Sequence, residues 1–300
     1  MAFQNQNAKR PLLACEITLD RVIAARASDK MPRLDAFTSR KLDPGTITPG
    51  LGGPNVQNGE ALRAAISGSL ASVAGKSKDV IVIVPDAAVR VLLLDFDTLP
   101  TSAADTEPVI RFRLKKSLPF DVEHAALSYD IRRSNGMVHA VAAVSPKSIL
   151  EEYENAVRDA GYTPGVILPS SLATLGLVEG ERPTLMLKVD PLNITIIAAE
   201  HKELRLVRTL ENPRGAEVTA AELAEAVLPS LVFVEDTFAA HVEEILISGI
   251  VPAHEVGPLL EQQTHAKVRE LAAQLSSEQN ISGEAVQPSL MAGIVGALLG

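Results

Sequence analysis

The amino-acid sequence predicts an α/β protein made of two similar halves, with an additional unit inserted into the first half. A pair of adjoining strands opens each half, at residues 12–28 and again at residues 184–210. Helical patterning and a further buried strand follow each pair. Residues 90–162 interrupt this order with a compact β-α-β-β-α unit, so the halves share a pattern of elements but no sequence repeat.

The first half begins with strands at residues 12–18 and 21–28, followed by a loop rich in Pro and Gly at residues 41–59. Asn58 can cap the next helix, because its side-chain oxygen can accept a hydrogen bond from a free backbone N–H. The apolar run at residues 80–84 is continuous. Such a run is typical of a strand that is buried on both faces of a parallel or mixed sheet.

The inserted unit starts with a strand at residues 89–96. Residues 106–108 (Thr-Glu-Pro) predict the start of a helix, and Pro119 requires that helix to end before it. Residues 134–136 (Ser-Asn-Gly) predict a hairpin between two strands. A second helix is expected from Pro146 to Gly161.

The remaining elements follow in simple order. A buried strand at 166–168 and a short helix after Ser170 complete the first half, and the polar stretch 179–183 marks a boundary. Thr219 and Glu222 have the spacing of a capping box, and Pro229 is expected to interrupt the helix that follows. The other predicted elements of the second half are strands at 184–190, 193–199, 204–210 and 244–249, a helix at 252–263, a loop at 275–288 and a helix at 290–299.

The composition restricts the class of protein. Of the 300 residues, 46% are hydrophobic and 22% are charged, which is the range of globular proteins. A formal net charge of −9 and an aromatic content of 3% argue against binding to nucleic acid. Cys15 is the single cysteine and lies in an apolar run, so we expect a buried core residue in a reducing compartment.

No segment predicts export, membrane insertion or a common catalytic site. The N-terminus lacks the apolar core of a signal peptide, and no apolar run approaches the roughly 20 residues of a membrane span. There is no G-x-S-x-G motif, the six histidines lack metal-ligand spacing, and Gly52-Gly53 lacks the spacing of a phosphate-binding loop. We therefore expect a cytoplasmic protein with no catalytic and no metal-binding residues.

The segment 109–131, VIRFRLKKSLPFDVEHAALSYDI, carries a resemblance to a known family. A charged helix, a Pro119-Phe120 break, an acidic residue and a strand with a tyrosine near its end occur in this order in the PilM family. These are actin-like cytoplasmic proteins of type IV pilus assembly. The resemblance covers most of the chain from Leu12 onward and is most specific over residues 90–170.

The resemblance implies a duplicated actin-like (ribonuclease H-like) fold with the β-α-β-β-α subdomain inserted in the first half. It assigns residues 11–89 to the first lobe and 90–163 to the inserted subdomain. Residues 164–182 return to the first lobe, and residues 183–300 form the second lobe.

Actin-like ATPases hold a nucleotide between two Asp-x-Gly phosphate loops and a small-residue adenosine turn. In this sequence Glu16 stands in the position of the first Asp and Thr18 in that of its glycine. Asp190 is kept in the second loop, but Pro191 removes a backbone donor. Ser248-Gly249 is what remains of the adenosine turn. We therefore expect this nucleotide site to be lost or weak, so that ATP with Mg²⁺ is a doubtful cofactor and the protein is not an enzyme.

The resemblance implies a scaffold protein of a type IV pilus or related machine, held at the inner face of the inner membrane through its partners. The expected partners are the cytoplasmic tail of a PilN-like membrane protein and also the pilus motor ATPases. The predicted contacts are Arg111, Arg113, Lys115 and Phe120, because an apolar anchor beside basic side chains suits an extended peptide.

Other interpretations stay open. In one, the protein is a working ATP-binding switch, with Glu16 and Asp190 holding Mg²⁺ and Ser248-Gly249 contacting adenosine. In another, it is similar to GspL of type II secretion, or it is an α/β protein unrelated to pili. The basic residues 111–116 can also be simply the solvated face of a helix.

Overall fold

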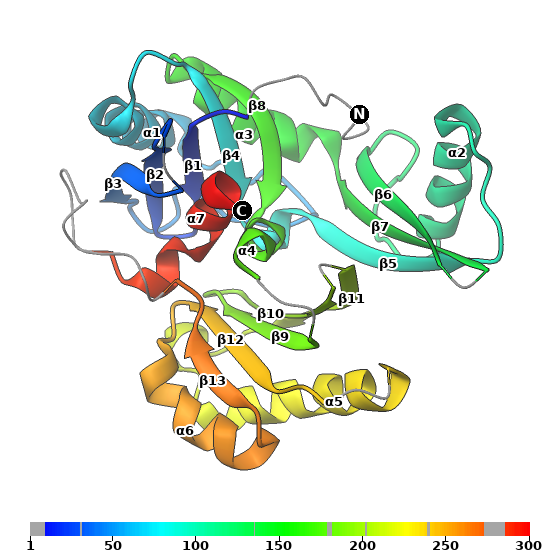
Figure 1. Ribbon diagram of the computed structural model, residues 1–300. Coiled ribbons are helices and arrows are strands. Elements are labelled where there is room, and N and C mark those ends of the chain that lie inside the picture. The colour runs from blue at the N-terminus through cyan, green and yellow to red at the C-terminus, as the bar shows by residue number, and fades with distance from the viewer. Residues whose placement is uncertain are drawn as a thin grey trace.

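The structure is a computed structural model with two stacked lobes and a smaller sheet at the side of the first lobe (Figure 1). Each lobe is built on a five-stranded sheet, and the smaller sheet has three strands. The structure describes residues 10–30, 32–134, 136–178, 182–201, 203–238, 241–272 and 286–300.

The first sheet has the strand order β3-β2-β1-β4-β8. Strands β3, β2 and β1 are antiparallel, whereas β1, β4 and β8 are parallel. The strands are β1 (Leu13–Ile17), β2 (Arg21–Ala27), β3 (Leu34–Lys41), β4 (Asp79–Val84) and β8 (Thr163–Pro169).

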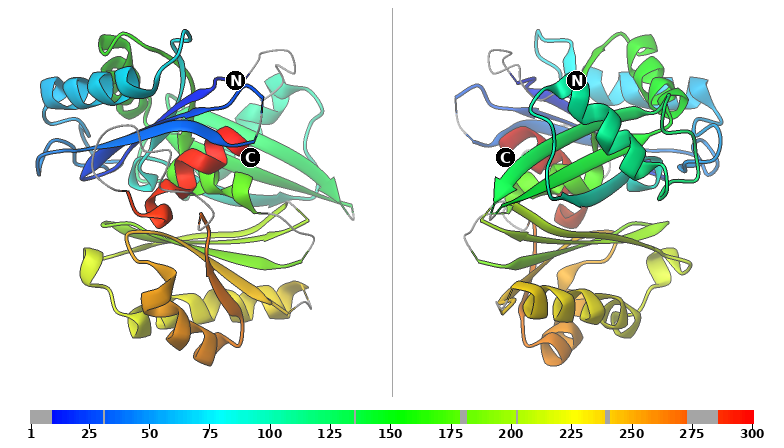
Figure 2. Two further views of the ribbon diagram at one scale, coloured as in Figure 1. Left: turned by 60° about the vertical axis from the view of Figure 1, so that its left-hand side comes forward. Right: turned by 90° about the vertical axis from the view of Figure 1, so that its right-hand side faces the viewer.

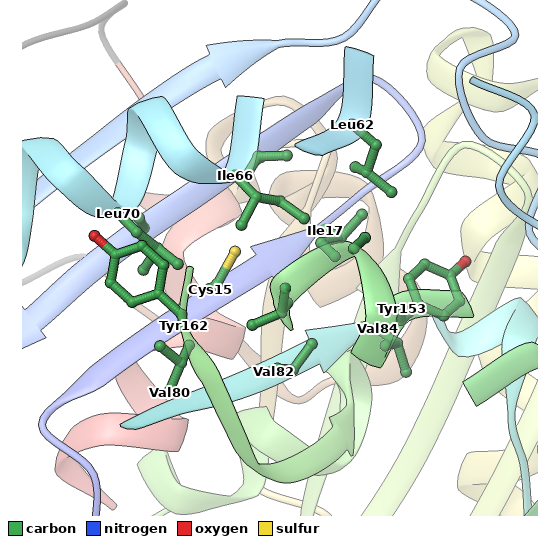
Figure 3. Close-up of a cluster of buried hydrophobic side chains, with 14 of the residues drawn as sticks. Cys15, Ile17, Leu62, Ile66, Leu70, Val80, Val82, Val84, Tyr153 and Tyr162 are labelled. Atoms are coloured by element: carbon green, nitrogen blue, oxygen red, sulfur yellow. The ribbon is translucent and has the colours of Figure 1, made fainter. Parts of the chain in front are cut away.

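Helices cover both faces of this sheet. Helices α1 (Gly59–Val73) and α3 (Lys147–Asp159) lie on one face. Between them and the sheet lies the core of Figure 3, where Tyr153 packs among aliphatic side chains around Cys15. Cys15 is fully buried, so its predicted place in the core is confirmed, and this burial raises the pKa of its thiol to about 12.

Most predictions for the first lobe are confirmed. Asn58 caps α1 by accepting a hydrogen bond from the backbone N–H of Ala61. The apolar strand β4 lies between the parallel strands β1 and β8. Strand β3 was not predicted. The prediction that residues 166–168 are buried is wrong, because β8 lies at the edge of the sheet and Val166 is 37% exposed.

The inserted unit is an antiparallel sheet of order β5-β7-β6, with α2 packed on one face. The second helix of the predicted β-α-β-β-α unit is α3, which packs on the first sheet beside α1 instead. Its elements are β5 (Arg90–Phe96), α2 (Ala103–Leu114), β6 (Ala126–Ser134) and β7 (Met137–Ser145). Ser134 pairs with Met137, which confirms the hairpin, although Asn135 lies outside the described residues.

Helix α2 begins earlier than predicted. Ser102 is its N-cap, accepting a hydrogen bond from the N–H of Asp105, so Pro108 lies inside the helix and not at its start. The hydroxyl of Thr106, the first residue of the predicted helix start, donates to the carbonyl of Pro100 at 2.9 Å. The helix ends at Leu114, before Pro119 as expected.

The second lobe repeats the arrangement of the first. Its sheet has the order β11-β10-β9-β12-β13, with three antiparallel strands followed by parallel ones, which confirms the predicted duplication. Its elements are β9 (Thr184–Val189), β10 (Asn193–Glu200), β11 (Glu203–Glu211), α5 (Ala220–Phe238), β12 (Glu244–Gly249), α6 (Ala253–Thr264) and β13 (Lys267–Glu270). Helices α5 and α6 cover the face that points away from the first lobe (Figure 1).

Two local predictions in this lobe have different outcomes. The capping box is confirmed, since Thr219 N–H donates to the Glu222 carboxylate and Glu222 N–H donates to the Thr219 hydroxyl. The predicted interruption at Pro229 is wrong, because α5 runs through it. Strand β13 was not predicted. The stretches 179–181 and 273–285 lie outside the described residues, so most of the predicted boundary and of the predicted late loop is not described.

The last helix, α7 (Ala292–Leu299), returns to the first lobe although residues 183–300 were assigned to the second. It packs with α4 (Ser170–Thr174) on the remaining face of the first sheet, where Ile294 and Leu298 contact the sheet core. Short 3₁₀ turns complete the structure: η1 (Asp86–Ala88), η2 (Leu175–Leu177), η3 (Gly215–Glu217) and η5 (Pro288–Met291). Within the described part of the chain, no helix is both long and apolar enough to cross a bilayer.

Docking of α7 requires a glycine at position 296. A Cβ atom there would lie 2.1 Å from the carbonyl oxygen of Ala173, which is backbone and cannot move aside cheaply. We expect Gly296→Ala to lower the free energy of unfolding by about 2 kcal/mol or more, measured by urea unfolding.

The control is Gly68→Ala in α1, where the added methyl group meets the flexible end of Arg40. Since alanine favours helix over glycine by about 1 kcal/mol, this variant should be neutral or stabilised. Equal losses in the two variants would contradict the described docking of α7.

Candidate functional site between the lobes

A small cavity lies between the lobes, at the carboxyl ends of β1, β4 and β9. In open α/β sheets this end of parallel strands is the usual place for ligands. The cavity leaves about 30 Å³ for solvent. That volume holds one or two water molecules, whereas pockets for nucleotide-sized ligands have roughly 300–1,000 Å³. The lining residues are Glu16, Ile17, Thr18, Leu19, Pro49, Pro85, Asp86, Ala87, Ser170, Lys188, Asp190, Pro191, Leu192 and Asn193.

The centre of the site is Lys188 of β9, whose side chain is 8% exposed. Its ammonium is paired with Asp190, and it lies 3.7 Å from the carboxylate of Asp86. Burial alone would lower the pKa of Lys188, but Asp190, Asp86 and Glu16 together raise it above its ordinary value. Lys188 is therefore a permanent cation among acidic side chains.

Asp86 links the two lobes. It belongs to the turn η1 after β4 of the first lobe, and its side chain is 4% exposed. One carboxylate oxygen accepts the backbone N–H of Ser171 at 2.8 Å. The other faces the second lobe, where it lies 3.5 Å from the hydroxyl of Thr195 and 3.7 Å from the ammonium of Lys188.

Glu16 lies at the end of β1 and is buried. The hydroxyl of Ser170 donates to its Oε1 atom, whereas its Oε2 atom has no hydrogen-bond partner among the described residues. Burial raises the pKa of Glu16 to about 7, with Lys188 and Ser170 opposing that rise. Gly293 of α7 lies over this carboxylate, because a Cβ atom there would be 2.7 Å from Oε1.

The turn between β1 and β2, which corresponds to the first phosphate loop, is closed on itself. The backbone N–H of Thr18 donates to the carbonyl of Arg21 at 2.9 Å, and its hydroxyl donates to the carboxylate of Asp20 at 3.0 Å. Burial would raise the pKa of Asp20, but hydrogen bonds from Arg21 and Thr18 hold it below its ordinary value. The Thr18 N–H, which a phosphate loop would direct at an anion, is therefore used within the hairpin.

The turn between β9 and β10, which corresponds to the second phosphate loop, is also closed. The N–H of Asp190 donates to the carbonyl of Asn193 at 2.8 Å. The Asn212 amide donates to the Asp190 carbonyl at 2.8 Å, and Pro191 has no N–H to donate. Burial raises the pKa of Asp190, while its pairing with Lys188 opposes the rise.

The structure brings together only part of the predicted nucleotide site. Glu16, Thr18 and Asp190 line one cavity, but Ser248 and Gly249 do not. Gly249 has φ +102°, and a Cβ atom there would lie 2.0 Å from the carbonyl oxygen of Val189. Ser248 is 1% exposed. This pair therefore forms a tight structural turn in the second lobe.

The residues present do not fit ATP with Mg²⁺. The cavity is an order of magnitude too small, and the Lys188 ammonium lies between the carboxylates that a divalent cation would need. Among the residues that the structure describes, no group of three or more Asp, Glu, His or Cys side chains is arranged to hold a metal ion.

The predicted partner contacts differ in accessibility. Arg111 is occupied inside the inserted unit, where it donates to Glu107 at 2.9 Å and to the carbonyls of Val122 and Ala125. Phe120 is half-buried and packs against the core of that unit. The accessible members are Arg113 and Lys115, which are exposed; Lys115 also lies 3.7 Å from Glu123.

Sequence reasoning missed Lys188 and Asp86. A lysine within the largely apolar strand 184–189 was a usable signal, because a charge in a buried strand needs a partner. The partner could not be predicted, since Asp86 precedes Lys188 by about 100 residues and meets it only when the lobes close.

The comparisons with known proteins agree on the fold. No protein-family model matches the sequence, and no curated protein is significantly similar to it. Among solved structures, the PilM-PilN type IV pilus biogenesis complex matches with a TM-score of 0.80 and 18% identity over 97% of this chain and 98% of that one. The chain therefore has the actin-like ATPase fold, as the sequence predicted.

Two further structures have the same fold at lower similarity. The cytoplasmic domain of EpsL, an inner-membrane component of the Vibrio cholerae type II secretion system, matches with a TM-score of 0.53 and 12% identity over 96% of this chain and 94% of that one. A Bacteroides thetaiotaomicron protein of unknown function with an actin-like ATPase fold matches with a TM-score of 0.52 and 11% identity over 95% and 94% of the two chains.

Removing the Lys188 cation should destabilise the protein in a pH-dependent way. Lys188→Met leaves Glu16, Asp86 and Asp190 without a counter-charge, so we expect a loss of about 3 to 5 kcal/mol of unfolding free energy at pH 8. At pH 5 the loss should be smaller, because buried carboxyls can then take up protons.

Urea unfolding at the two pH values measures this effect. Lys147→Met is the control, since the Lys147 side chain is 70% exposed and should contribute less than about 0.5 kcal/mol. An equal loss at pH 5 and pH 8 would contradict the role of Lys188 as the buried counter-ion.

Glu16 should make the protein less stable as the pH rises. Its folded pKa of about 7 lies above its ordinary value, so the folded state keeps the proton to a higher pH than the unfolded chain. Stability is therefore lost between about pH 5 and pH 7. Glu16→Gln has no carboxyl group to titrate and therefore avoids this loss. As the pH rises from 5 to 8, its unfolding free energy should increase by about 3 kcal/mol relative to that of the wild type.

The same urea measurement on Glu225→Gln, at an exposed position of α5, is the control, and this change should alter the free energy of unfolding by less than about 0.5 kcal/mol. If the difference in unfolding free energy between Glu16→Gln and the wild type did not change between pH 5 and pH 8, Glu16 would be ionised throughout this range.

Proposed function

We propose that this protein is a cytoplasmic scaffold of a type IV pilus or related secretion machine, and that it binds the cytoplasmic tail of a PilN-like inner-membrane protein. Its fold does not depend on nucleotide. The observation that carries the proposal is the likeness to the PilM-PilN complex over nearly the whole of both chains, with a TM-score of 0.80. Through this partner the protein is held at the inner face of the inner membrane.

The closed cleft supports a scaffold function and argues against a motor function. An actin-like ATPase works by moving its lobes around a nucleotide, whereas here Lys188 and Asp86 join the lobes directly. The inserted unit is also tied to the second lobe, through an ion pair of 3.0 Å between Arg132 and Glu203. These contacts favour one fixed arrangement of the lobes.

We propose the turn after α2 as the place where the tail binds. Lys115 is exposed there and Phe120 is half-buried, which gives an extended peptide one basic and one apolar contact. Arg113 lies instead beside the end of β5, near Asp95 and Asp97, and Arg111 serves the fold of the inserted unit.

Binding of a labelled tail peptide from the PilN-like protein of the same genome tests this proposal. We expect the wild type to bind, and Lys115→Glu to weaken binding about tenfold by repelling an acidic tail. Lys115 is preferred to Phe120, whose replacement would disturb the core of the inserted unit. Lys147→Glu, an equal charge change at an exposed side chain outside the inserted unit, is the control. Absence of binding by the wild type would overturn the proposal.

A second candidate function is an ATP-binding switch, because Glu16, Asp86 and Asp190 all converge on the cavity. Millimolar Mg-ATP should leave the melting temperature unchanged if the scaffold proposal is correct. A rise that Asp190→Ala abolishes would support the switch instead.

A further inference from the structure

Helix α2 carries an exposed apolar stripe on its outer face. Phe112 is 70% exposed and Val109 is 37% exposed, and Pro108 is exposed beside them. These positions lie three and four residues apart, so they form one side of the helix. Arg113 is exposed beside this stripe and Lys116 is exposed in the turn after the helix, and residues 109–116 contain four basic and no acidic residues.

Helix α5 carries a matching stripe of opposite charge. Val232 is 50% exposed, Phe233 is 49% exposed, and Pro229 is exposed one turn before them. Glu225 and Asp236 are exposed on the same side. The whole of α5, from Ala220 to Phe238, contains four acidic residues and no lysine or arginine.

The two stripes cannot meet within one molecule. Helix α2 lies on the inserted unit beside the first lobe, while α5 lies on the face of the second lobe that points away from the first (Figure 1). The two views of Figure 2 show the same separation. Each stripe is therefore free to contact another molecule, and each carries the charge that the other lacks.

We propose that the α2 stripe of one molecule docks on the α5 stripe of a second copy of this chain. Burial of the two phenylalanine side chains would drive the contact, and the pairing of Arg113 and Lys116 with Glu225 and Asp236 would orient it. Because different faces meet, each bound pair leaves one α2 stripe and one α5 stripe open. The contact is thus heterologous and can continue into a ring or a filament.

Sedimentation velocity over a concentration series of the full-length protein tests the contact. The wild type should associate as its concentration rises from about 1 to 200 µM, and Phe112→Ser and Phe233→Ser should each weaken association at least about tenfold. Val166→Ser is the control, because Val166 is an exposed apolar residue on β8, outside both stripes. It should associate as the wild type does.

Mixing the two variants tests the pairing itself. The Phe112→Ser variant keeps an intact α5 stripe, and the Phe233→Ser variant keeps an intact α2 stripe. We expect their mixture to form a one-to-one complex that grows no further. Mixing Arg113→Glu/Lys116→Glu with Glu225→Lys/Asp236→Lys should restore association that each lacks alone.

A wild type that stays monomeric at about 200 µM would overturn the proposal. So would association that neither Phe112→Ser nor Phe233→Ser weakens, or a mixture of these variants that forms no complex. Circular dichroism of each variant shows that its fold is kept, since all the changed side chains are exposed.

Discussion

The ammonium of Lys188 is held between carboxylates that belong to different lobes. Asp190 follows Lys188 by two residues in the second lobe. Asp86 approaches the ammonium of Lys188 from the turn after β4 of the first lobe. A charge of this kind is expensive to bury and is tolerated only when partners surround it. The relative position of the lobes therefore depends on the contact of Lys188 with Asp86 and Asp190. Removal of one of these side chains leaves an uncompensated buried charge.

This constraint would allow an actin-like fold to persist without a bound nucleotide, as the scaffold proposal requires. In the nucleotide site that the family resemblance implies, phosphates and a metal ion would balance these acidic groups. Here Lys188 supplies that balance from within the chain, and both turns that correspond to phosphate loops use backbone N–H groups for hydrogen bonds of their own.

Elements with strong local signals were predictable from the sequence. The apolar run of β4, the Asn58 cap, the hairpin after Ser134 and the Thr219 capping box each depend on a few neighbouring residues. Strand β3 was missed because its sequence, LDAFTSRK, alternates poorly between polar and apolar residues. The helix bounds predicted from Pro108 and Pro229 were wrong, because both prolines lie inside helices. Packing of the buried face of a helix outweighs the one hydrogen bond that a proline removes.

The candidate site was only half predictable for a similar reason. Glu16, Thr18 and Asp190 could be placed through the family resemblance, but Lys188 acquires its role from residues about 100 positions away. Ser248 and Gly249 matched the adenosine turn by sequence, whereas their burial gives them a structural role. The exposed Phe112 and Phe233 were also missed, because exposure of an apolar residue depends on what the fold places over it.

A double-mutant cycle between Asp86 and Lys188 tests the central claim most directly. Unfolding free energies of Asp86→Asn, Lys188→Met and the double variant give the coupling between the two side chains. If this pair joins the lobes, the two single variants together should lose more unfolding free energy than the double variant does. The difference should be at least about 2 kcal/mol. Additive losses, equal within about 0.5 kcal/mol, would show that the lobes are held together by other contacts.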